Sequence, residues 1–141
     1  PEFVSPSTSS VVQHRIGAIK AGTFDINTAC AGFVTALNTG SKFIAGDDTY
    51  QNILVIGAYA MSKFLDLHDK KTVTLFADGA GAVVLSPVTD GSGFLNGELF
   101  SDGQYNEWMG IYAGGTKFPI TREVVDNKII CRSLSKNFRK N

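Results

Sequence analysis

The stretch that most constrains this chain runs from Phe24 to Phe33, where a short apolar–polar alternation passes directly into small residues around Cys30. The alternation over residues 24–27 predicts the end of a strand. Apolar residues then recur at helical spacing, which predicts a helix over residues 30–45. A strand that turns into a helix through alanine and glycine leaves one side chain uncovered at the helix N-terminus, where free N–H groups favour a thiolate. The pattern therefore predicts a cysteine nucleophile mounted in a strand–turn–helix elbow.

The residues alone leave other interpretations of Cys30 open. Cysteine is among the most buried residue types, so a single cysteine in an apolar segment is more often inert core than a nucleophile. A self-contained Cys–His hydrolase is a further alternative, with His14 or His68 as its base, because Asp69 could orient the neighbouring His68. Such a triad is defined by geometry and not by adjacency in the sequence, so the pattern assigns no base.

Length and composition favour one ordinary domain, because 141 residues with 43% apolar content suffice for a real core. The chain has no run of the roughly 20 apolar residues that a membrane helix needs, and its start resembles no signal peptide. We therefore expect no membrane partner and a cytoplasmic location. The two cysteines stand far apart, which predicts neither a disulfide framework nor a metal site.

The elements around the elbow extend the pattern. A helix is expected to begin at Ser5 and Pro6 and to end at Gly17, because serine caps, proline opens and glycine closes helices. The continuous apolar run over residues 52–57 predicts a strand buried on both faces. Together with the strand over residues 24–27 and the helix between them, it would form a right-handed βαβ unit.

A hairpin is expected next. Residues 72–76 and 82–86 have strand composition, and the Asp-Gly pair at 78–79 between them favours a tight turn. Residues 94–100 predict a further strand, and residues 104–119 predict an ordered loop, because they are rich in glycine and aromatics without periodicity. The predicted fold class is α/β: a mixed sheet with a βαβ unit and a hairpin, covered by helices.

The end of the chain differs in charge from the rest. The formal net charge is zero, yet no acidic residue follows Asp126, and the residues from Lys128 onward carry only positive charges. Basic and apolar residues recur there at intervals of four, which predicts a two-faced helix. Such a segment is typical of contact with an acidic partner or of a solvated chain end, and the solvated end is the simpler interpretation.

Three motifs resemble the β-ketoacyl-acyl-carrier-protein synthase III family of the thiolase-like superfamily. They are Pro-Ser-Thr-Ser-Ser-Val-Val-Gln at 6–13, Ala-Cys-Ala-Gly-Phe at 29–33 and Leu-Phe-Ala-Asp-Gly-Ala-Gly-Ala-Val-Val-Leu at 75–85. Small departures include Ala77, where the family usually has glycine. The resemblance predicts a partial thiolase-like N-terminal half over residues 1–122 and a basic tail of no recognised family over residues 123–141.

The resemblance implies a condensing enzyme of fatty acid biosynthesis. Cys30 would take the acyl group from acyl-CoA as a thioester, and decarboxylating malonyl-acyl-carrier-protein would attack it. The N–H of Cys30 would be one of two oxyanion donors. Phe76 would line the acyl channel, and Lys70 would lie near the CoA nucleotide. The implied partners are acyl-CoA, acyl carrier protein and a second copy in a homodimer, with no nucleic acid, cofactor or metal.

The family pattern also marks what this sequence lacks. Members run to more than twice this length in two similar halves, and the histidine and asparagine that stabilise the decarboxylating malonyl group belong to the second half. Nothing here resembles that half, so the chain is expected to be an interior piece of a synthase. The alternatives are a catalytically incomplete module that binds acyl-CoA or assembles with another polypeptide, and another thiolase-like condensing enzyme.

Overall fold

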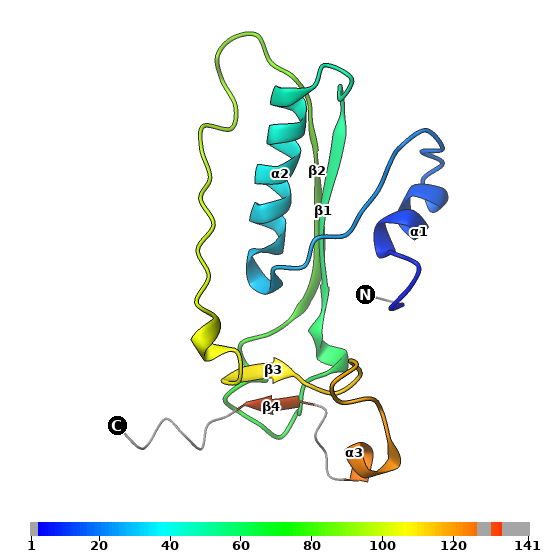
Figure 1. Ribbon diagram of the computed structural model, residues 1–141, viewed down its shortest axis with the longest axis vertical. Coiled ribbons are helices and arrows are strands. Elements are labelled where there is room, and N and C mark those ends of the chain that lie inside the picture. The colour runs from blue at the N-terminus through cyan, green and yellow to red at the C-terminus, as the bar shows by residue number, and fades with distance from the viewer. Residues whose placement is uncertain (1–2, 127–130, 134–141) are drawn as a thin grey trace. The chain divides into compact units, whose positions relative to one another are not determined.

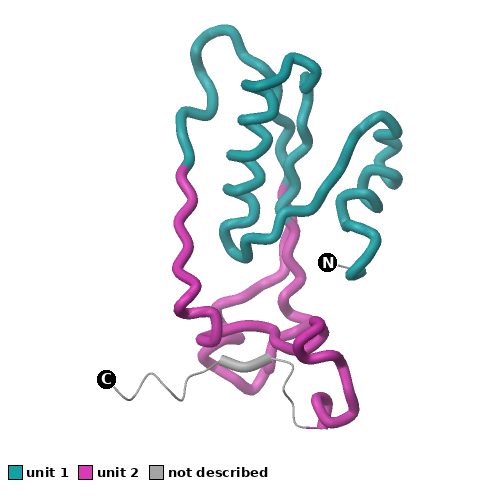
Figure 2. Tube along the Cα trace, in the orientation of Figure 1, with its two compact units in different colours: residues 1–57, 82–97 teal, residues 58–81, 98–141 magenta. Residues whose placement is uncertain are grey.

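The computed structural model describes residues 3–126 and 131–133, the last three by their backbone. The chain divides into two compact units, drawn in teal and magenta in Figure 2. The first unit consists of residues 1–57 and 82–97, and the second of residues 58–81 and 98–141. Both units combine helices with strands (Figure 1), so the predicted α/β class is confirmed.

The first helix, α1, spans Thr8–Arg15. Its N-cap is Ser7, whose hydroxyl accepts a hydrogen bond from the N–H of Ser10 at 3.4 Å. The predicted start at Ser5 is therefore wrong, because the side chain that reaches the free N–H groups of the first turn is that of Ser7. The predicted end is confirmed: Gly17 follows the helix with a φ of +71°, in the left-handed region that glycine adopts most readily.

The second helix, α2, spans Gly32–Gly46, which confirms the predicted helix after the elbow. It lies directly on the sheet formed by β1 (Ile53–Ala60) and β2 (Asp78–Leu85), as Figure 1 shows. A Cβ at Gly40 would meet the Leu85 side chain at 3.0 Å, and a Cβ at Gly57 would meet the Phe33 ring at 3.0 Å. Because glycine has no side chain, α2 can approach β1 and β2 closely at these two positions.

The predicted strand over residues 24–27 is wrong. Residues 21–28 belong to no helix or strand, and the sheet order is β1–β2, so the described residues form no βαβ unit at this place. Four residues need a neighbouring strand for their backbone hydrogen bonds. Side chains hold the segment here: the ring of Phe24 meets that of Phe43 edge to face at a centroid distance of 6.1 Å.

The predicted hairpin is also wrong. Residues 71–75 form turns, and the Asp78-Gly79 pair lies inside β2 instead of between two strands. The cause is local hydrogen bonding: the carboxylate of Asp69 accepts from the N–H of Lys71 at 3.1 Å and from the hydroxyl of Thr72 at 2.9 Å. Such side-chain bonds offer the backbone an alternative to a sheet ladder.

The second unit contains a small antiparallel sheet in which β3 (Met109–Ile111) pairs with β4 (Cys131–Ser133). A short helix, α3, spans Arg122–Asp126, and 3-10 turns span Met61–Lys63 and Gly103–Tyr105. β3 corrects the prediction of a loop over residues 104–119, since its partner strand is distant in the sequence. The strand predicted over residues 94–100 is not formed.

The predicted helix of the basic tail is wrong at residues 131–133, which form β4. The other residues of that prediction, 128–130 and 134–140, lie outside the described part of the chain. Within the described ranges, no helix has both the length and the apolar character of a membrane span.

Candidate functional site

Cys30 is exposed and occupies the middle of the 3-10 turn Ala29–Ala31, which leads directly into α2. Among the described residues no side chain caps the N-terminus of α2, and its first turn holds no acidic residue. Free N–H groups at a helix N-terminus carry partial positive charge. Cys30 therefore lies just before a positive helix end, and the first turn of that helix holds no carboxylate that would offset the charge.

The turn before the thiol has a constrained backbone. Ala29 has a φ of +48°, in the left-handed region that is unfavourable for a residue with a Cβ. Its N–H donates to the side-chain oxygen of Asn27 at 3.2 Å, and the N–H of Ala31 donates to the carbonyl of Thr28 at 3.1 Å. These bonds close the turn on both sides of Cys30, so the turn and the helix of the predicted elbow are formed, while its strand is not.

A pair of threonines joins the elbow to the helix. The hydroxyl of Thr28 donates to the hydroxyl of Thr35 at 2.9 Å, and Thr35 is only 7% exposed. The hydroxyl of Thr39 donates to the carbonyl of Thr35 at 2.8 Å, one turn further along α2. The sequence pattern did not indicate this pair, because two threonines seven positions apart carry no local signal.

Asp25 holds the segment that precedes the elbow. Its carboxylate accepts from the N–H of Thr8 at 2.8 Å and from the N–H of Ser9 at 2.9 Å, both in the first turn of α1. Hydrogen bonding from Ser9, opposed by slight burial and aided by Thr8, holds the pKa of Asp25 below its ordinary value of 3.8. The sequence indicated only that Asp25 is the polar member of an alternation.

The two other predicted site residues, Phe76 and Lys70, lie in the second unit, whereas Cys30 lies in the first. Phe76 is half-buried just before β2, and its ring lies 6.3 Å from that of Tyr59 at an interplanar angle of 37°. Lys70 is exposed in a turn, where its carbonyl accepts from the hydroxyl of Thr74 at 3.3 Å. The roles of Phe76 and Lys70 in substrate binding stay predictions.

Next to Phe76, a second carboxylate organises the start of β2. Asp78 accepts from the N–H of Ser62 at 2.8 Å and also from the Ser62 hydroxyl. These hydrogen bonds hold the pKa of Asp78 below its ordinary value, and the charge of Lys63 adds a smaller effect in the same direction. Asp78 therefore connects β2 to the 3-10 turn after β1. The sequence pattern had instead predicted that Asp78 belongs to a hairpin turn.

The two histidines are both exposed. His14 lies in the last turn of α1, and the N–H of His68 donates to the carboxylate of Asp66 at 2.9 Å. His14 belongs to the first unit and His68 to the second. Within residues 3–126, the part with described side chains, no three histidines, cysteines or carboxylates gather closely enough to hold a metal ion.

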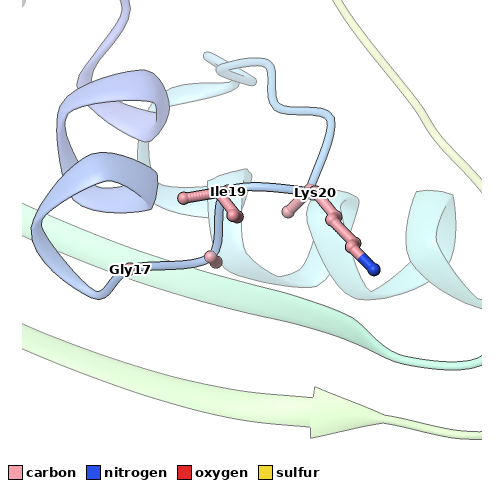
Figure 3. Close-up of a pocket in the computed structure, with 5 residues that line it drawn as sticks. Gly17, Ile19 and Lys20 are labelled. Carbon is pink, nitrogen blue, oxygen red and sulfur yellow. The ribbon is translucent and has the colours of Figure 1, made fainter.

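A hollow of about 450 Å³ lies over the turn that follows α1. Figure 3 shows its lining, which comes from the five consecutive residues Gly17–Ala21. Neither Cys30 nor the aromatic and basic residues predicted for the site belong to this lining. The hollow is the open side of a single turn and lies apart from the elbow in the sequence.

Comparison with known families matches residues 24–103 to a family model described as 3-oxoacyl-[acyl-carrier-protein (ACP)] synthase III. The β-ketoacyl-[acyl-carrier-protein] synthase III of Desulfitobacterium hafniense is 43% identical over 129 residues, which cover 92% of this chain and 39% of the relative. The protein of the same name from Clostridioides difficile is 42% identical over 126 residues, 89% of this chain and 38% of that one. The chain thus spans about two-fifths of the length of these relatives.

Solved structures give a corresponding result. The synthase III of Thermus thermophilus superimposes with a TM-score of 0.79 at 27% identity, over 96% of this chain and 41% of that chain. The synthase III of Aquifex aeolicus superimposes with a TM-score of 0.76 at 33% identity, over 96% and 39%. The boundary predicted between residues 122 and 123, where the basic tail would begin, stays a prediction.

Proposed function

This chain belongs to the 3-oxoacyl-[acyl-carrier-protein] synthase III family, and from that premise we propose that Cys30 is the acyl-accepting nucleophile of a condensing enzyme. The observation that carries the proposal is the exposed thiol in a constrained turn at the N-terminus of α2. A helix N-terminus favours the thiolate, which is the form of cysteine that attacks a thioester carbonyl.

The proposed reaction has two steps. In the first, the Cys30 thiolate attacks the carbonyl carbon of an acyl-CoA thioester, and the tetrahedral oxyanion collapses with release of the CoA thiolate. In the second, malonyl-acyl-carrier-protein loses carbon dioxide, and its carbanion attacks the acyl-Cys30 thioester to give the 3-oxoacyl product and the free thiolate. We assign the N–H of Cys30 as one donor to the oxyanion of both steps.

The predicted binding residues take their roles from the same proposal. Phe76 offers an aromatic surface beside Tyr59, which suits an acyl chain, and the exposed ammonium of Lys70 suits a CoA phosphate. The proposed partners are acyl-CoA, acyl carrier protein and a second copy of the chain in a cytoplasmic homodimer. No nucleic acid, membrane or cofactor has a part in the proposed reaction.

The second candidate is that this chain is a module of a synthase that is catalytically incomplete by itself. Large apolar side chains are exposed on the face of β1 that points away from α2: Leu54 is 44% exposed and Ile56 40%, whereas Val55 between them lies under α2. In a folded protein, contiguous apolar surface of this kind marks a face that another segment covers. Since the chain spans 39% of the length of its D. hafniense relative, we propose that further synthase polypeptide covers this face and supplies the decarboxylating residues.

The experiment that tests the first candidate is intact-mass measurement after incubation with acetyl-CoA, followed by peptide mapping. An acetyl adduct on Cys30, absent from Cys30→Ala and retained in the matched control Cys131→Ala, is the expected result. An equal adduct on both cysteines would contradict a specific nucleophile. Acetyl-CoA binding without any adduct would favour the incomplete module.

A further inference from the structure

The segment that leads to the elbow is held by side chains and not by a sheet. Residues 21–28 belong to no helix or strand. Phe24 packs edge to face on Phe43 of α2, and Thr28 hydrogen-bonds to Thr35 of the same helix. Between them, Asp25 bonds to α1. The approach to Cys30 is therefore fastened to two helices by individual side chains.

Asp25 completes the cap of α1. Its two carboxylate oxygens accept the N–H groups of Thr8 and Ser9, and the hydroxyl of Ser7 accepts that of Ser10. Hydrogen bonds to an ionised acceptor are about twice as strong as neutral ones. The negative charge also lies at the positive end of the α1 dipole. Among these attachments of the segment, the Asp25 carboxylate is the one that carries a full charge.

The elbow requires such an attachment. Ala29, directly before Cys30, has a φ of +48°, and a backbone in that region persists only when its surroundings hold it there. Thr28 fixes the end of the segment nearest the thiol, and Asp25 fixes it three residues earlier. If either attachment is lost, fewer contacts hold Ala29 in this region, and we expect the turn to relax and to shift Cys30 relative to the N-terminus of α2.

We propose that Asp25 is a positioning residue for Cys30: its carboxylate fastens the segment before the elbow to the first turn of α1 and so keeps the thiol at the end of α2. This inference rests on the proposed nucleophilic role of Cys30. In this proposal α1 anchors the segment before Cys30, and Asp25 itself takes no part in the chemical reaction.

The test measures alkylation of Cys30 by iodoacetamide in the full 141-residue chain, with Cys131 of the same molecule as the internal standard. Asp25→Ala is expected to lower the Cys30-to-Cys131 rate ratio about tenfold, because iodoacetamide reacts with the thiolate, and a helix N-terminus favours the thiolate only of a cysteine held close to it. Asp25→Asn is expected to give an intermediate ratio, since it keeps one acceptor oxygen.

Ser7→Ala is the matched control. It removes the neighbouring cap of the same helix end but leaves the bonds of Asp25 in place. In Ser7→Ala, we expect the Cys30-to-Cys131 rate ratio to stay within about twofold of that of the unsubstituted chain, because loss of this cap of α1 alone does not move the elbow. Circular dichroism checks that each variant folds. If Asp25→Ala does not fold, Asp25→Asn is the variant that tests the proposal.

An unchanged ratio in a folded Asp25→Ala or Asp25→Asn variant would overturn the proposal. An equal loss in Ser7→Ala would also overturn it, because the effect would then belong to the stability of α1. Alkylation requires no acyl-CoA. Failure of acetyl transfer to Cys30 therefore remains distinguishable from failure of the Asp25 contact.

Discussion

The hydroxyl of Thr28 lies 2.9 Å from the hydroxyl of Thr35, and this hydrogen bond joins the residue two positions before Cys30 to a buried position in the first turn of α2. Cys30 therefore belongs to a short loop whose two ends, Thr28 and Thr35, are joined by this bond. Because the backbone of α2 fixes Thr35, the bond restricts the motion of the turn that contains Cys30.

The first prediction concerns this bond. Thr28→Val keeps the shape of the side chain but leaves the buried Thr35 hydroxyl without its partner, which we expect to lower the free energy of unfolding by about 1–2 kcal/mol. Thr28→Ser retains the hydroxyl and is the control. Urea unfolding followed by circular dichroism measures both, and equal stability of the two variants would show that the bond contributes nothing.

The second prediction concerns the positive φ of Ala29. Ala29→Val is expected to destabilise the fold by about 1–2 kcal/mol, because a β-branched residue fits the left-handed region poorly. Ala29→Gly is expected to be tolerated, since relief of strain offsets the larger entropy of the unfolded chain. Thermal unfolding gives the order glycine, alanine, valine at this position, and a valine variant as stable as the glycine variant would refute the argument.

The third prediction concerns packing of α2 on β1. A Cβ at Gly57 would lie 3.0 Å from the nearest atom of the Phe33 ring, so Gly57→Ala is expected to displace the ring at a cost of about 1–3 kcal/mol. At Gly46 a Cβ would meet no atom within 4 Å, and Gly46→Ala is the matched control. Unfolding midpoints in urea compare the two, and loss of stability at Gly46 alone would contradict the packing described here.

The fourth prediction concerns pH. The folded-state pKa of Asp25 is lower than its ordinary value of 3.8, so its ionised form stabilises the fold above that value. The contribution is lost as pH falls through the folded-state pKa. The difference in unfolding temperature between the unsubstituted chain and Asp25→Asn is therefore expected to shrink as pH is lowered from about 6 to about 3. A difference that stays constant over this range would show that the charge of Asp25 is not what stabilises α1.

Several features of the site could be predicted from short stretches of sequence. Small residues on both sides of Cys30 indicated a sharp turn, and apolar spacing after it indicated a helix, because both signals act within a few turns of the chain. The apolar run over residues 52–57 likewise predicted a strand, which forms as β1 and extends to Ala60. Its predicted burial on both faces is wrong, because Leu54 and Ile56 are exposed. At these places local preference and final secondary structure agree.

The hairpin shows why other predictions were wrong. An Asp-Gly pair favours a turn only while the aspartate is free to bond to its own backbone. In the structure the carboxylate of Asp78 instead accepts from Ser62, sixteen positions earlier, and the pair enters β2. The pairing of Met109 with Ser133 is similarly distant, so no local pattern predicted β3.

The α/β class, the sharp turn at Cys30, α2 and the family resemblance could all be predicted, because each depends on residues that are close together in the chain. The attachment of the segment before Cys30 through the bonds of Asp25 to α1 and of Thr28 to Thr35, in place of a strand, depends on the folded chain. The physical reason is that a carboxylate or hydroxyl satisfies whichever donor the fold brings within hydrogen-bonding distance, and that choice depends on how segments far apart in the sequence pack.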